Sequence, residues 1–179
     1  MSVFRNVVDF NRVCGVIPSD EPTPSLSLLK TPAFLNAWKL VVEEFNETAA
    51  AVGKIMETDQ PTEEMYKELV DGLIDMEYVI LGMGCRMGVD MDLAHNLVHT
   101  NNMSKICQSE QEAQLTVEKY LNSPGLGYLS PTYRTVEGPW GETLWVVYNK
   151  DTAKVLKSVS WKEVDLTPAV TPYPQSIPE

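Results

Sequence analysis

The sequence has few of the residues on which nucleic-acid-binding and metal-thiolate proteins depend. It contains three cysteines, two histidines and 14 lysines and arginines, against 25 aspartates and glutamates, for a net charge of −11. This balance argues against a protein that binds a nucleic-acid polymer, because such binding rests on Lys and Arg neutralising phosphates. A small phosphate ligand held through bound cations remains compatible with it.

Disulfide, zinc-ribbon and membrane signals are also missing. Cys14, Cys85 and Cys107 are odd in number and lack CxxC spacing, and no apolar run approaches the length of a membrane span. We therefore expect reduced thiols in a cytoplasmic protein with no membrane partner. With 179 residues, 44% of them hydrophobic, the chain is expected to form one globular domain.

Helix signals occupy the first two thirds of the chain. Thr31-Pro32 and Pro61-Thr62 are typical helix starts, and Gly15 and Gly88 are typical helix ends. We expect residues 1–123 to form a helical core, with helices over 4–14, 31–56, 62–87 and 90–106 and a further short segment over 109–123.

The last third has a different character. Beyond Pro124, a Gly-Pro-Trp-Gly turn separates two β-rich runs, which predicts a hairpin of two or three strands. The final stretch, "DLTPAVTPYPQSIPE", carries four prolines and is expected to be an extended arm. The predicted fold is therefore a mainly α bundle with a small C-terminal β-hairpin and a proline-rich tail, residues 124–179 belonging to the same domain as the core.

The stretch "LVVEEFNETAAAV" places three glutamates on one side of a predicted helix. Glu43, Glu44 and Glu47 fall within roughly a 100° arc, with apolar residues opposite. Taken alone, this spacing is most typical of a solvated amphipathic face.

A second row of acidic residues lies along the next helix. We call this row and the row formed by Glu43, Glu44 and Glu47 the two acidic seams. Glu68, Asp71 and Asp75 fall within roughly 60° of one another, and the rest of the circumference is apolar. A helix that is apolar nearly all round is expected to be buried, and buried carboxylates need a cation. Lys67 and Arg86 are the only cations on this helix, so a metal is the favoured partner. Oxygen-only ligands suit Mg²⁺ or Mn²⁺ bridging to substrate phosphates; the alternative is a seam that faces solvent.

The ordered motifs resemble a known family. "EEFNE", "ELVDGLIDMEYVILGMGCRMGVDMD" and "VHTNNMSKI", followed by "VEKY" and "WVVYNKDTAKVLKSVSWKEVDLTP", look like the MazG-like all-α nucleoside triphosphate pyrophosphohydrolases. The resemblance implies a helical core assembled as a homodimer or a dimer of dimers. It also implies Mg²⁺ or Mn²⁺, more than one ion per site, and hydrolysis of (d)NTPs to the monophosphate and pyrophosphate.

The resemblance also implies roles for particular residues. Glu44 and Glu47 match the metal-binding pair of EExxE, with Glu43 in support, and Asp75 matches the aspartate of the second motif. The glutamate expected three residues before Asp75 is Gly72 here, so Asp71 or Glu68 would take its place. Either Glu43 or Glu47 would serve as general base, and water would attack the α or the β phosphorus.

Substrate contacts follow from the remaining motifs. Lys39, Arg86 and Lys105 are the cations available to the phosphates, and Asn102 and Lys105 match an NMSK segment that is similar to a substrate-contacting element of the family. The plain alternative for the last two is a helix cap with a surface lysine. The proportions are compatible with phage MazZ-type enzymes, which act on purine deoxynucleotides such as dGTP; a phage-encoded protein would work in the host cytoplasm. Candidates for the base pocket, unranked, are Val7, Asp9, Asn11 and Trp38.

Three other classes compete with this reading. A di-iron bundle needs two Glu-x-x-His motifs, which the chain lacks. His95 and His99 have zinc-ligand spacing, but no third ligand lies nearby in sequence. A non-catalytic interaction or regulatory module with a solvated acidic face is the main alternative to an enzyme.

Overall fold

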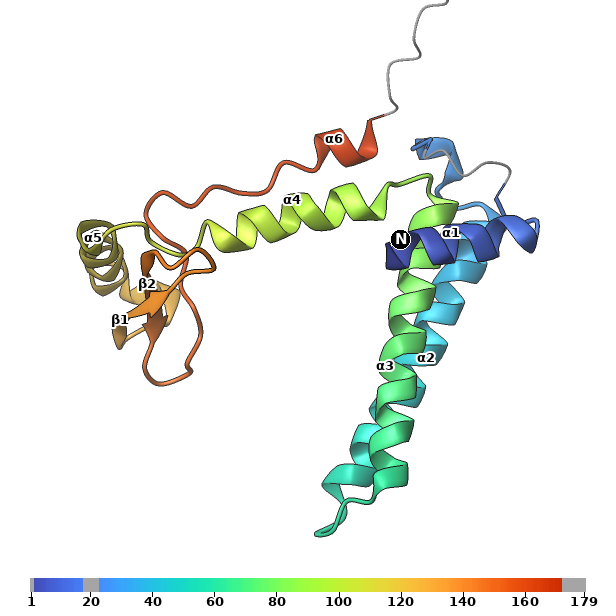
Figure 1. The fold of residues 1–179 in the computed structure, drawn as a ribbon, viewed down its shortest axis with the longest axis horizontal. Helices are drawn as coiled ribbons and strands as arrows, with labels where there is room; N and C mark the ends of the chain where they lie inside the picture. The colour runs from blue at the N-terminus through green and yellow to red at the C-terminus, as the bar shows by residue number, and fades with distance from the viewer. Residues whose placement is uncertain (1, 18–22, 172–179) are drawn as a thin grey trace, which may run out of the picture. The chain divides into compact units, whose positions relative to one another are not determined.

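A computed structural model describes residues 2–17 and 23–171, which are mainly helical with a small antiparallel hairpin, as predicted. The described residues group into two compact units, one running up to Ala94 together with residues 166–171, the other spanning His95–Asp165. The elements are α1 (Val3–Val13), η1 (Leu26–Leu28), α2 (Pro32–Met56), α3 (Glu63–Arg86), α4 (Met91–Met103), α5 (Glu110–Leu121), η2 (Pro124–Leu126), β1 (Pro131–Glu137), β2 (Thr143–Asn149) and α6 (Thr167–Val170) (Figure 1).

The helix starts lie where the capping signals predict them. The hydroxyl of Thr31 accepts a hydrogen bond from the Phe34 amide at 3.2 Å, with Pro32 at the first helical position of α2. Thr62 caps α3 in the same way. Beyond α3, Gly88 has φ +70°, and a Cβ there would lie 2.3 Å from the Thr23 carbonyl oxygen. Only glycine therefore allows the segment at Thr23 to approach the end of α3 so closely.

In the first unit, α2 and α3 form a helical hairpin, and α1 packs on α3 (Figure 1). The buried residues of α2 are small: Ala37, Thr48 and Ala51. Small residues let the two helix backbones come close together. The apolar core of this unit is Phe4, Val7, Val8 and Cys85, where α1 meets the C-terminal part of α3.

The expectation that α3 is buried is wrong for the single chain. Val70, Leu73, Ile74 and Ile80 are 42%, 47%, 55% and 43% exposed. The reason is that α3 contacts α2 along one stripe and α1 near its end, which leaves its other apolar side uncovered. One side of α2 also carries exposed apolar residues, and these recur at heptad spacing. We call this side of α2 and the exposed apolar side of α3 together the exposed apolar face. On α2 it consists of Leu35, Trp38, Val42, Phe45, Val52 and Met56.

The second unit is built on the hairpin. Strands β1 and β2 pair from Pro131↔Asn149 to Glu137↔Thr143, a two-stranded sheet as predicted. Its core consists of Cys107, Ala113, Tyr120, Val147 and Leu156.

Of the proline-rich tail, predicted as extended, Thr167–Val170 form the short helix α6, and residues 172–179 lie outside the described residues. Within the described parts of the chain, no helix is both long enough and apolar enough to span a membrane.

Candidate active site

The two acidic seams meet around Glu44. Its side chain lies at the edge of the stripe through which α2 packs on α3, one turn before the buried Thr48. Partial burial raises the pKa of Glu44 most, and repulsion from Glu47, Asp75, Glu43 and Asp71 raises it further. We call these five residues the acidic group. Every charged group that shifts this pKa is another carboxylate of the acidic group, so these negative charges repel one another.

The other two candidates on α3 behave differently. Glu68 forms an ion pair with Lys54 across the hairpin, so its charge is already balanced. Gly72 faces α2: a Cβ there would lie 2.8 Å from the Thr48 hydroxyl oxygen, which itself donates to the Glu44 carbonyl at 2.8 Å. A glutamate at position 72 would therefore have to displace Thr48, whereas Asp71 acts electrostatically on Glu44.

The donor set of the acidic group suits a hard divalent cation, since it consists of carboxylates alone. In the described residues, however, no three carboxylate, imidazole or thiol side chains are arranged closely enough to hold a metal ion. Glu43, Glu47, Asp71 and Asp75 are all exposed, so their side chains are free to rotate towards an ion. The residues fit such an ion in chemistry and in freedom of movement.

A cationic hollow adjoins the acidic group. Its volume is about 620 Å³, and its wall includes Lys39 and Arg86 together with Glu43 of the acidic group. The Arg86 guanidinium donates to the Ala33 carbonyl at 3.4 Å, while its Nε is buried without a hydrogen-bond partner. We call this the Lys39 hollow. Two of the three cations predicted to contact phosphates thus line one hollow, whose wall also includes the Glu43 carboxylate.

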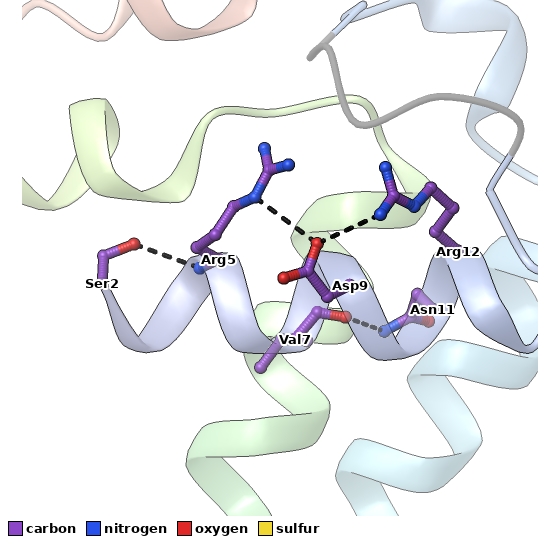
Figure 2. A network of polar contacts seen from close by, with 6 residues as sticks. All are labelled: Ser2, Arg5, Val7, Asp9, Asn11 and Arg12. Carbon is purple, nitrogen blue, oxygen red and sulfur yellow. Dashed lines mark hydrogen bonds and ion pairs between the residues drawn. The ribbon is translucent and has the colours of Figure 1, made fainter.

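The N-terminal base-pocket candidates are mostly committed to structural contacts. Figure 2 shows Asp9 between Arg5 and Arg12 on the surface of α1, at 3.5 and 3.6 Å. Val7 is fully buried in the core, and Trp38 lies on the exposed apolar face. Asn11 is 5% exposed and donates to the Val7 carbonyl (Figure 2). Of these candidates, Asn11 lines a hollow, a small one of about 90 Å³ beside Tyr78.

The remaining candidates belong to the second unit. Lys105, two residues beyond the end of α4, donates to the Asn102 carboxamide oxygen at 2.7 Å, so these two residues contact each other; their substrate role stays a prediction. His95 and His99 are exposed and stack with ring centroids 6.4 Å apart. Among the described residues they have no third ligand that would complete a zinc site.

Comparison with known proteins places this arrangement in a family. The family model of phosphoribosyl-ATP pyrophosphohydrolase matches residues 8–102, just over half of the chain. This match covers α2, α3 and the acidic group. A curated relative, the uncharacterized protein L479 of Acanthamoeba polyphaga mimivirus, is 38% identical over 76 residues, which are 42% of this chain and 29% of that protein.

The chain therefore spans less than a third of the length of that relative. The family match agrees with the mainly helical fold. The chain belongs to the phosphoribosyl-ATP pyrophosphohydrolase family, within the MazG-like all-α nucleoside triphosphate pyrophosphohydrolase superfamily.

Proposed function

We propose that the protein is a metal-dependent (d)NTP pyrophosphohydrolase that converts purine deoxynucleoside triphosphates such as dGTP to the monophosphate and pyrophosphate. The observation that carries this proposal is the junction of the Lys39 hollow with the acidic group through Glu43. Cations suited to a triphosphate and mutually repelling carboxylates suited to a divalent ion are thus close together.

Glu44, Glu47, Asp71 and Asp75 would hold Mg²⁺ or Mn²⁺, more than one ion per site. Asp71 is favoured over Glu68 because Asp71 acts on Glu44, whereas Glu68 is paired with Lys54. When bound, such a cation supplies charge neutralisation to the triphosphate and makes water at the site more acidic.

The protein's own side chains would carry the rest of the reaction. Lys39 and Arg86 would bind phosphate oxygens in the hollow and offset the charge that develops there. Water attacks the α or β phosphorus, the P–O bond of the α–β linkage breaks, and the proton of water passes to a carboxylate. Glu43 is favoured as that general base because it borders both the hollow and the acidic group, with Glu47 as the other candidate.

The nucleotide requirement is tested by measuring pyrophosphate release from dGTP, dATP, dCTP, dTTP and dUTP with Mg²⁺ or Mn²⁺. Phosphoribosyl-ATP is included as a second candidate because the matching family carries its name. We expect the largest kcat/KM for a purine deoxynucleotide and loss of activity in excess EDTA. Hydrolysis in ¹⁸O-water distinguishes α from β attack by which product carries the label. If no nucleotide releases pyrophosphate, the protein is a non-catalytic module.

Replacing Glu44 with glutamine is expected to stabilise the metal-free protein, because it removes a repelled charge. The melting temperature should rise by about 1–3 °C at neutral pH. Since the folded-state pKa of Glu44 is raised above its ordinary value of 4.5, the stability it contributes is present below that value and is lost as the pH rises. The gain from Glu44→Gln should therefore vanish under acid conditions.

The same variant tests the metal site without an activity assay. Mg²⁺ or Mn²⁺ should raise the melting temperature of the wild type and of a Glu64→Gln control, because a bound ligand stabilises the folded state. Glu64 is an exposed glutamate in the first turn of α3, outside the acidic group. In Glu44→Gln this cation effect should be lost. An equal cation effect in all three proteins would contradict the assignment of Glu44.

A further inference from the structure

A second hollow lies beyond the Lys39 hollow in the same compact unit. It has a volume of about 340 Å³ and a mainly apolar wall; we call it the Leu28 hollow. It shares Val16, Ala33 and Arg86 with the Lys39 hollow. Its other apolar wall residues are Ile17, Leu28 and Cys85.

We infer that the Leu28 hollow binds the purine-sized base of the nucleotide whose phosphates lie in the Lys39 hollow, an inference that rests on the proposed function. The order of the walls supports it. The Lys39 hollow has Glu43 of the acidic group in its wall, together with Lys39 and Arg86. Arg86 also lines the apolar Leu28 hollow, which adjoins it. This order matches a nucleotide with its metal-binding phosphates at one end and its flat heterocycle at the other.

Size separates the two apolar hollows of this unit. Ligand sites generally measure about 300–1,000 Å³, and an apolar cavity of about 150 Å³ holds a single benzene ring. The hollow beside Asn11 and Tyr78, at about 90 Å³, is smaller than that. The Leu28 hollow, at about 340 Å³, is large enough for a two-ring base. The base therefore belongs on the Leu28 side of Arg86, where none of Val7, Asp9, Asn11 and Trp38 lies.

The chemistry of the wall indicates how the base is held. The Cys85 thiol has its pKa raised by burial to about 11, so it is neutral at physiological pH. The Thr31 hydroxyl already donates to the Leu28 carbonyl and accepts from the Phe34 amide. Arg86, which also lines the Lys39 hollow, is the charged residue of this wall. The other residues that line it are uncharged, so binding of the base comes mainly from burying the ring faces. We therefore expect selection by ring size, a purine over a pyrimidine, more than by the pattern of polar edges.

The inference is tested by equilibrium binding of two probes in Mg²⁺, α,β-methylene-dGTP, which resists hydrolysis at the α–β linkage, and inorganic tripolyphosphate, which has no base. Leu28→Trp would fill the hollow. It should lower the affinity for the dGTP analogue at least ten-fold and change the affinity for tripolyphosphate less than two-fold. Leu28→Ala removes wall surface without adding bulk. It should lower the affinity for the analogue by a smaller factor than Leu28→Trp does, and it should leave the affinity for tripolyphosphate unchanged.

Leu26→Trp is the matched control. Leu26 is 86% exposed in the same short turn and does not line the hollow, so both probes should bind this variant as they bind the wild type. The inference would be overturned if the Leu28 variants lowered the affinity for both probes equally. It would also be overturned if both variants bound the analogue as tightly as the wild type does, or if the wild type did not bind the analogue.

Failure of the proposed function gives a different result. If no nucleotide is hydrolysed but Leu28→Trp selectively weakens the analogue, the base site stands and the hydrolase assignment falls. If dGTP is hydrolysed and Leu28→Trp leaves its KM unchanged, the hydrolase stands and the base site falls.

Discussion

Asp75→Asn is expected to lower kcat for pyrophosphate release about 10³-fold, since the loss of one metal-binding charge removes several kcal/mol of transition-state stabilisation. The change keeps the size and shape of the side chain. Asp75 is exposed on α3 and is among the carboxylates that raise the pKa of Glu44. Removing its charge relieves repulsion in the metal-free protein, so the fold should not lose stability, and the measured loss should lie in catalysis and cation binding.

The control for this experiment is Asp59→Asn. Asp59 is exposed in the turn between α2 and α3 and does not act on Glu44. It should keep wild-type turnover. Glu47→Gln should behave like Asp75→Asn, because both residues belong to the acidic group. If Asp75→Asn retains more than about a tenth of the wild-type kcat, the acidic group is a solvated face, which is the reading that its α2 spacing alone favours.

Local signals explain why the helix limits could be predicted. Thr31 with Pro32, and Thr62 before two glutamates, satisfy the first free amides of α2 and α3. Such contacts span three or four residues, so the sequence contains them in full. The hairpin between β1 and β2 follows in the same way from a turn flanked by β-rich runs.

Features made by distant segments could not be predicted. The Leu28 hollow combines residues near positions 16, 28 and 85, and no spacing within any one segment indicates that they meet. The ion pair of Lys54 with Glu68 depends on the register of α2 against α3, as does the contact between Gly72 and Thr48. Helical projection correctly groups Glu68 with Asp71 and Asp75 on one side of α3. It does not reveal which of them has a cation opposite.

The wrong prediction that α3 is buried has a different origin, and it leads to a proposal about assembly. Projection shows that α3 is apolar nearly all round, yet a single chain leaves Leu73 and Ile74 about half exposed. Monomeric soluble proteins rarely expose large contiguous apolar patches. We propose that a second copy of the chain covers the exposed apolar face, because α2 presents apolar residues there at the heptad spacing through which helices pack together and α3 adds Val70, Leu73, Ile74 and Ile80.

Leu73→Glu is therefore expected to convert a dimer, or a dimer of dimers, into monomers. In a two-fold assembly each interface would receive two buried carboxylates, and each costs several kcal/mol without a partner. The dissociation constant should rise by more than 100-fold, measured by sedimentation or by light scattering after gel filtration. Leu115→Glu is the matched control: Leu115 on α5 is also 47% exposed, but it lies in the other compact unit. A monomeric wild type, or equal masses for the wild type and Leu73→Glu, would mean that something other than a second copy covers this face. A change in mass for Leu73→Glu alone would assign the exposed apolar face to a subunit interface.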